Sequence, residues 1–117
     1  MPGPLHTVAE TEGFIADCKA AGVSEAERAA IIGAVAADPV AGSLIVGSAG
    51  ARKVRVAGRG HGKSGGWRVI TAYLGSFAPV YLLALYGKGA KANLRADEIA
   101  ALAAFVRATK VFWKGRQ

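Results

Sequence analysis

Three strand-like segments joined by short connections constrain the fold of this chain more than any other feature. The segments are 51–57 (ARKVRVA), 67–74 (WRVITAYL) and 78–86 (APVYLLALY). The first alternates apolar and cationic residues, and the other two are rich in β-branched and aromatic side chains. Because a parallel crossover needs a dozen or more residues, these segments are expected to pair in antiparallel fashion.

Helical periodicity marks three further segments, 11–22, 24–38 and 95–113. The second opens on the capping-box pair Ser24 and Glu27 and stops before Pro39, which cannot continue a helix. The segment 3–8 (GPLHTV) is extended and predicts a short first strand. We therefore expect one α+β domain over 1–117, with two N-terminal helices packed on a small, mostly antiparallel sheet and a C-terminal helix.

Charge is distributed very unevenly along the chain. Residues 1–50 hold two basic and six acidic residues (net −4), whereas residues 51–117 hold thirteen basic and two acidic residues (net +11). No carboxylate occurs between Pro39 and Ala96, where nine lysines and arginines fall. A region of one sign and this length indicates a polyanionic partner, and nucleic acid is the leading candidate.

Two further features limit the classes of protein to which the chain can belong. The longest apolar run, 77–86, is far shorter than the roughly 20 residues of a membrane span, so no membrane partner is expected. Cys18 is the one cysteine, which suits a reducing cytoplasm, and it is expected to be a buried helix residue rather than a nucleophile.

Residues 57–64 (AGRGHGKS) match the loose pattern of a nucleotide-binding P-loop. A P-loop needs a helix after the glycines, because the helix N-terminus and the loop amides bind the phosphates together. Here Gly65, Gly66 and then a strand-like run follow, so we interpret the segment as a hairpin connection.

The sequence also lacks the residues needed for a metal site or for a Ser/His/Asp catalytic triad. The histidines are His6 and His61 alone, and the basic region has no carboxylates to bind a metal. We therefore expect no cofactor and no metal, with His61 acting as an exposed residue or a phosphate contact.

The alternation in the first strand puts Lys53 and Arg55 on one face, and Arg68 begins the neighbouring strand. Antiparallel pairing could bring these cations, with Lys88 and Lys91 after the third strand, to one phosphodiester. Guanidinium groups stabilise the charge that develops on its oxygens, and neighbouring cations lower the pKa of a lysine toward use as a proton carrier. On chemistry alone, binding of RNA without catalysis remains the commoner outcome.

The strings 52–70 (RKVRVAGRGHGKSGGWRVI) and 80–94 (VYLLALYGKGAKANL) together resemble the RelE superfamily of bacterial toxins, most closely its HigB-type branch. The resemblance spans about residues 14–105. It implies a RelE-like microbial ribonuclease fold and cytoplasmic cleavage of mRNA, often in the ribosomal A site. It also implies neutralisation by a cognate antitoxin, commonly one with a helix-turn-helix domain.

Carried over to this chain, the resemblance implies that Lys53 and Arg55 contact phosphate and assist proton transfer, and that Arg68 stabilises the transition state. Lys88 and Lys91 match basic residues that bind substrate near the leaving group, and cleavage follows metal-free attack by the RNA 2′-hydroxyl. Expected RNA contacts beyond these are Arg52, Arg59, His61, Lys63 and Arg95. The chain has Ala90 and Ala92 in a segment where some relatives carry tyrosine or glutamate, so the general acid stays unassigned.

Three functions are therefore open: an endoribonuclease toxin, a non-catalytic RNA- or ribosome-binding module, and a protein whose basic face chiefly binds an acidic antitoxin segment.

Overall fold

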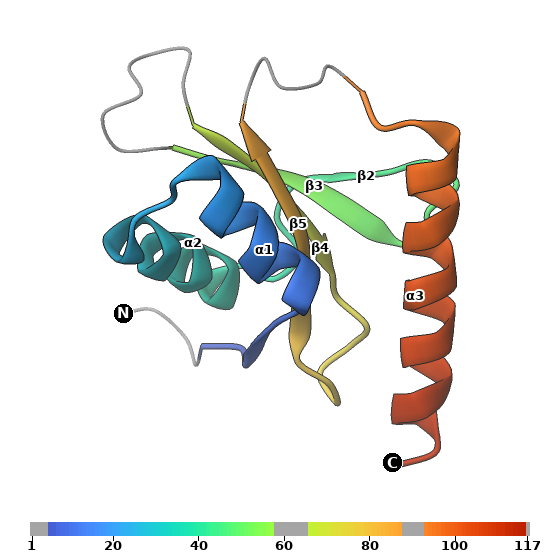
Figure 1. The fold of residues 1–117 in the computed structure, drawn as a ribbon. Helices are drawn as coiled ribbons and strands as arrows, with labels where there is room; N and C mark the ends of the chain where they lie inside the picture. The colour runs from blue at the N-terminus through green and yellow to red at the C-terminus, as the bar shows by residue number, and fades with distance from the viewer. Residues whose placement is uncertain (1–4, 58–65, 88–92, 117) are drawn as a thin grey trace.

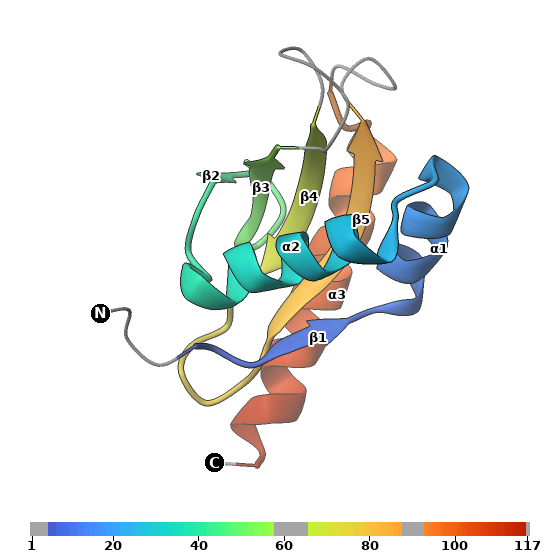
Figure 2. The same ribbon diagram turned by 90° about the vertical axis from the view of Figure 1, so that its left-hand side faces the viewer.

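The computed structural model describes residues 5–57, 66–87 and 93–116. In chain order the elements are β1 (Val8–Glu10), α1 (Glu12–Ala21), α2 (Glu25–Ala37), β2 (Ser43–Leu44), β3 (Ala51–Val56), β4 (Trp67–Ala72), β5 (Val80–Gly87) and α3 (Ala96–Lys114). They form three layers, with α1 and α2 on one face of the sheet and α3 over the other (Figures 1 and 2). The expected α+β fold is confirmed.

The sheet has five strands in the order β1-β5-β4-β3-β2. Its centre is the antiparallel set β3, β4 and β5, as the short connections predict. Two pairings were not predicted: β1 runs parallel to β5, and β2 adds to β3 at the opposite edge. Of the segment expected to form the first strand, only Val8 belongs to β1, which continues to Glu10.

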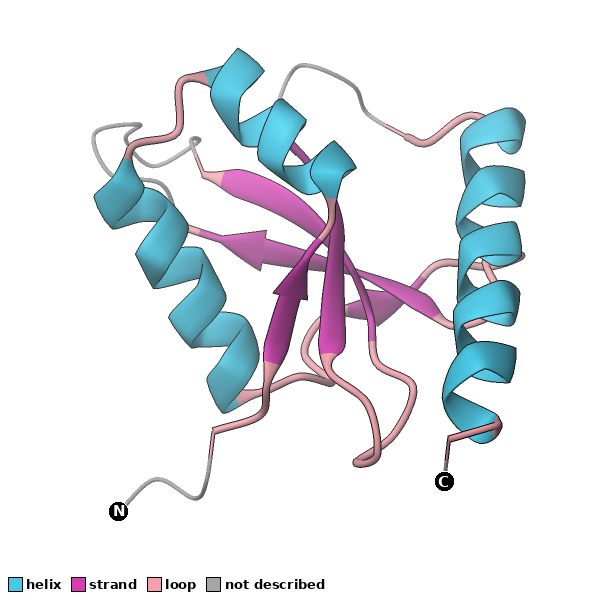
Figure 3. Ribbon diagram, turned by 60° about the horizontal axis from the view of Figure 1, so that its bottom comes forward, coloured by secondary structure: helices cyan, strands magenta, loops and turns pink. Residues whose placement is uncertain are grey.

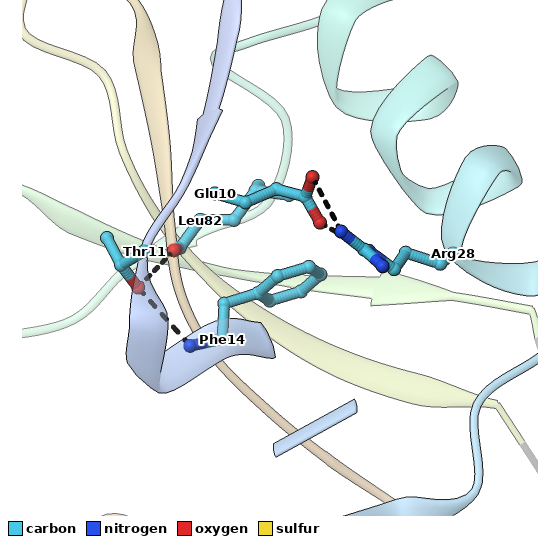
Figure 4. Close-up of polar contacts among 5 residues, drawn as sticks. All are labelled: Glu10, Thr11, Phe14, Arg28 and Leu82. Carbon is cyan, nitrogen blue, oxygen red and sulfur yellow. Dashed lines mark hydrogen bonds and ion pairs between the residues drawn. The ribbon is translucent and has the colours of Figure 1, made fainter. Parts of the chain in front are cut away.

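Both N-terminal helices begin at side-chain caps. Thr11 caps α1: its hydroxyl accepts a hydrogen bond from Phe14 N–H (3.2 Å) and donates one to the Leu82 carbonyl of β5 (2.8 Å; Figure 4). The capping box at the start of α2 is present, with Ser24 and Glu27 bonding each other's backbone N–H at 3.1 Å. The Thr11 cap therefore also anchors α1 to the sheet.

Two apolar cores lie on the two faces of the sheet. Phe14 and Cys18 of α1 and Ile31 and Val35 of α2 pack on the first face, which the strands line with Trp67, Val69, Val80, Leu82 and Leu85. Val106 of α3 packs on the second face, which the strands line with Ala51, Ile70, Ala72 and Tyr86. Cys18 is buried in α1 as expected, and burial raises the pKa of its thiol.

The first face is also tied together by polar groups. Arg28 of α2 forms a two-pronged ion pair with Glu10, which ends β1 (Figure 4). The indole N–H of Trp67 donates to Glu27 (3.1 Å), which joins α2 to β4. Figure 3 shows α3 on the other side of the sheet from α1 and α2.

A β-bulge interrupts the pairing of β4 with β5. Ile70 pairs with Ala84, but the next residue, Thr71, pairs with Leu82, so Leu83 is the extra residue on β5. A bulge changes the phase of the side-chain alternation. As a result both Tyr81, below the bulge, and Tyr86, above it, belong to the face that α3 covers.

In the described part of the chain, no helix combines the length and the apolar character required to cross a membrane.

Candidate nucleic-acid interface

The cations predicted from the alternation of β3 meet on the face of the sheet that looks toward α3. Arg55 on β3 lies directly opposite Arg68 on β4, which in turn lies opposite Tyr86 on β5. Directly opposed residues project to the same face with Cβ atoms about 5 Å apart. Lys53 is two residues from Arg55 on the same face, opposite Ile70. Lys53, Arg55 and Arg68 are called the cation cluster below.

The cluster is partly open to solvent. Arg55 is exposed, whereas Lys53 and Arg68 are half-buried. The Nη1 atom of Arg68 is shielded from solvent and has no hydrogen-bond partner among the described residues. A shielded guanidinium nitrogen without a partner is unfavourable by itself and is stabilised by an anionic acceptor.

The charged side chains on the strands that carry the cluster are all positive. The strands β3, β4 and β5 contain no carboxylate. Within the described ranges, Arg28 pairs with Glu10 and Arg95 pairs with Asp97, and neither of these ion pairs involves the cluster. The cluster therefore keeps its positive potential for a ligand.

Two other predicted RNA contacts are described, and neither joins the cluster. Arg52 alternates with Lys53 and so lies on the opposite face of β3, where its guanidinium donates to the Gly42 carbonyl (3.2 Å). Arg95 is the N-cap residue of α3, and its exposed guanidinium is held by the Asp97 carboxylate at 3.0 and 3.3 Å. That hydrogen bond is the main reason why the pKa of Asp97 is lowered.

The remaining predicted site residues lie outside the described residues: Arg59, His61, Lys63, Lys88 and Lys91. The ends of β3 and β5 and the start of β4 lie beside the cluster, because Val56 pairs with Trp67 and Trp67 with Gly87 (Figure 1).

A cavity of about 320 Å³ adjoins the cluster, between the upper half of β5 and the first turns of α3. Tyr86 lines it and Glu98 of α3 supplies a carboxylate to its wall. Sequence reasoning did not select either residue. Alternation along β5 alone could not have selected Tyr86, because the bulge at Leu83 decides which face its ring joins.

A second cavity, of about 400 Å³, lies beside Lys53. Its wall combines β2 and the residues after it with Asn93, Leu94 and Ile99 at the start of α3. Lys53 therefore borders a hollow in the surface.

Within the described ranges, no three histidine, cysteine, aspartate or glutamate side chains are grouped so that they could hold a metal ion. No protein-family model matches the chain.

Proposed function

We propose that this protein is an endoribonuclease toxin that cleaves mRNA without a metal ion, acts with the ribosome in the cytoplasm and is neutralised by a cognate antitoxin. The observation that carries the proposal is the cation cluster: Arg55 opposite Arg68, with Lys53 beside them on the same face. The toxin and antitoxin parts, including a helix-turn-helix domain in the antitoxin, are supported by the resemblance to HigB-type proteins.

The cluster suits cleavage of RNA by its own 2′-hydroxyl. The 2′-oxygen attacks the adjacent phosphorus and gives up its proton, and the 5′-oxygen leaves with a proton. The products are a 2′,3′-cyclic phosphate and a 5′-hydroxyl. Negative charge builds up on the non-bridging oxygens during this step, and fixed guanidinium groups of Arg55 and Arg68 stabilise it.

Arg68 is the strongest candidate for transition-state stabilisation. It lies on the central strand β4, flanked by β3 and β5, so its backbone is held on both sides. Its shielded Nη1 atom has no partner among the residues described, which suits a donor reserved for a phosphate oxygen. A donor held in place before the reaction requires little reorganisation during it. Lys53, two residues from Arg55 on the same face, supplies an amine for proton transfer.

A non-catalytic RNA- or ribosome-binding module is the second candidate. The exposed Arg55 and the carboxylate-free strands favour it, because phosphate neutralisation alone supplies affinity for RNA. The two candidates make the same contacts and differ only in whether the phosphodiester is broken.

The decisive experiment measures mRNA cleavage by purified protein, with and without ribosomes and in EDTA, together with RNA affinity. Arg68→Ala is expected to lower cleavage about 10²–10³-fold, the usual effect of losing one fixed donor. Binding of RNA by the wild type without any cleavage would instead favour the second candidate.

Arg52→Ala is the matched control for Arg55→Ala. Both variants remove one positive charge from β3, but Arg52 lies on the opposite face. We expect Arg55→Ala to lower cleavage strongly and Arg52→Ala to leave it close to the wild-type rate. Equal losses in the two variants would mean that total charge, and not the cluster, determines activity.

A further inference from the structure

We infer that α3 pairs in antiparallel fashion with α3 of a second copy of this chain, and that Phe112 of each copy enters an apolar groove of the other. α3 is the outermost layer on its side of the sheet, and no described element lies beyond it (Figures 1 and 3). The inference does not depend on the proposed function, because it concerns the side of α3 that is turned away from the sheet.

An apolar line runs along this side of α3, where a surface helix normally carries charges. Ala103 and Val106 are the buried residues of the helix and define the side that packs on the sheet. Four residues at successive spacings of four, three and four lie together on another side, and they are called the α3 seam below: Ala101, Phe105, Ala108 and Phe112. Such spacing is the pattern of the apolar positions of a coiled coil.

The exposure of the α3 seam marks it as an interaction surface. Its two alanines are exposed, and Phe105 is half-buried. Phe112 remains 49% exposed, although the Trp113 ring and the Arg116 guanidinium contact its ring. Val111, next to the seam, is 72% exposed. Contiguous apolar surface of this kind is typical of a protein–protein contact.

The alternation of small and large residues in the seam suits a second copy of the same helix. In an antiparallel pair, Phe105 lies opposite Ala108 of the second copy, and Phe112 lies opposite Ala101 of the second copy. Every layer then combines one large and one small side chain, which fills the space between the helices evenly. A parallel pair would instead place phenylalanine against phenylalanine and alanine against alanine.

The charges of α3 favour the same arrangement. The cations of its second half are exposed and lie on the side opposite the seam, so they do not face one another across the pair: Arg107, Lys110 and Lys114. The start of α3 carries two carboxylates, Asp97 and Glu98, against one cation, the N-cap Arg95, and its last turn carries Lys114. Antiparallel pairing brings the negative start of each helix beside the positive end of the other, and it also opposes the two helix dipoles.

A groove beside the seam accommodates Phe112 of the second copy. It has a volume of about 360 Å³ and lies between the start of α1 and the middle of α3, across Leu83 of the β5 bulge. Ala101 and Phe105 of the seam line it together with Leu102. Because Phe112 of the second copy lies opposite Ala101, its ring meets this groove. An aromatic side chain held in an apolar pocket is typical of the residues that contribute most to an interface.

The test is the molar mass of the purified full chain, measured by size-exclusion chromatography with light scattering over a range of concentrations. The wild type should have twice the mass of one chain. Ala108→Glu places a charge in the seam and should raise the dissociation constant of the dimer by about tenfold or more. Ala100→Glu is the matched control, since Ala100 is also an exposed alanine of α3 but lies outside the seam, and this variant should keep the dimer.

An exchange of side-chain size tests the antiparallel register. Ala101→Phe puts two phenylalanines in one layer, and Phe112→Ala leaves two alanines there, so each variant alone should dimerise about tenfold more weakly. A mixture of the two variants restores one phenylalanine opposite one alanine in every layer. It should therefore form a heterodimer, which native mass spectrometry resolves. Both positions are exposed, so circular dichroism should show the helix content of the wild type in each variant.

Three results would each overturn the inference. The first is a wild type with the mass of one chain at every concentration, which would leave the seam to a helix of a different protein. The second is a dimer that survives Ala108→Glu, and the third is a mixture of the two exchange variants that forms no heterodimer. Dimerisation and RNA cleavage are measured separately, so the failure of either one leaves the other standing.

Discussion

Replacing Thr11 by valine tests how α1 is joined to the sheet. Valine keeps the branched shape of threonine and removes only the hydroxyl, which accepts from Phe14 N–H at 3.2 Å and donates to the Leu82 carbonyl at 2.8 Å. The Phe14 N–H then loses its cap, which costs about 1 kcal/mol. The Leu82 carbonyl loses one of two bonds but keeps the one from Thr11 N–H at 3.1 Å, so this loss is limited to about 1 kcal/mol.

The two losses together predict that Thr11→Val lowers the free energy of unfolding by about 2 kcal/mol. Urea unfolding followed by circular dichroism measures this directly, and the midpoint should fall at constant slope. Thr11→Ser keeps both hydrogen bonds and should cost about 0.5 kcal/mol for part of a methyl group. Ser24→Ala removes the hydroxyl that caps α2 by accepting from Glu27 N–H, and should cost about 1 kcal/mol.

The test depends on how strongly each of the three variants lowers the free energy of unfolding. The hydroxyl would have no anchoring role if Thr11→Val unfolded at the wild-type urea concentration. It would also have none if Thr11→Ser were as destabilised as Thr11→Val, because the methyl group would then account for the loss.

Two further predictions concern backbone geometry and pH. Gly42 (φ +90°) and Gly22 (φ +72°) both adopt left-handed backbone, but a Cβ at Gly42 would overlap the Lys53 carbonyl, whereas nothing lies within 4 Å of one at Gly22. Gly22→Ala should therefore lower the free energy of unfolding by about 1 kcal/mol, and Gly42→Ala should lower it clearly more. Gly42→Ala should also weaken cleavage, because it displaces Lys53. Equal losses of stability in urea unfolding would contradict this prediction. The hydrogen bond from Arg95 lowers the pKa of Asp97 below its ordinary value of 3.8. The ionised Asp97 therefore contributes to stability at pH values above 3.8, and this contribution is lost as the pH falls through the lower pKa of the folded state. An NMR titration should show this low pKa in the wild type and a return toward 3.8 in Arg95→Ala, and identical titration curves would exclude the contact.

Local patterns predicted the elements that local interactions determine. The Ser24 capping box and the run ending at Asp38 predicted α2 almost to the residue, because the cap and the proline act within a few positions. The alternation of ARKVRV correctly placed Lys53 and Arg55 on one face, since a strand has a period of two residues. The same alternation separates Arg52 from them, and the prediction that it contacts RNA therefore receives no support from the geometry of the cluster.

Pairings between distant segments were beyond such patterns. β2 is two residues long within a glycine- and serine-rich connection, and its pairing depends on β3 rather than on its own composition. The parallel pairing of β1 with β5 joins residues about seventy positions apart. Glu98 and Tyr86 meet at one cavity only because α3 packs back on the sheet, so no spacing in the sequence indicates the site.

The bulge at Leu83 also has an evolutionary consequence. Deletion of that single residue would turn the present pairs Ile70–Ala84 and Thr71–Leu82 into consecutive rungs of a regular antiparallel ladder. Leu85 would stay in the core beneath α1, and Tyr86 would stay beside Arg68. The bulge therefore marks a position in β5 where one in-frame triplet can be lost without exchanging core and surface residues.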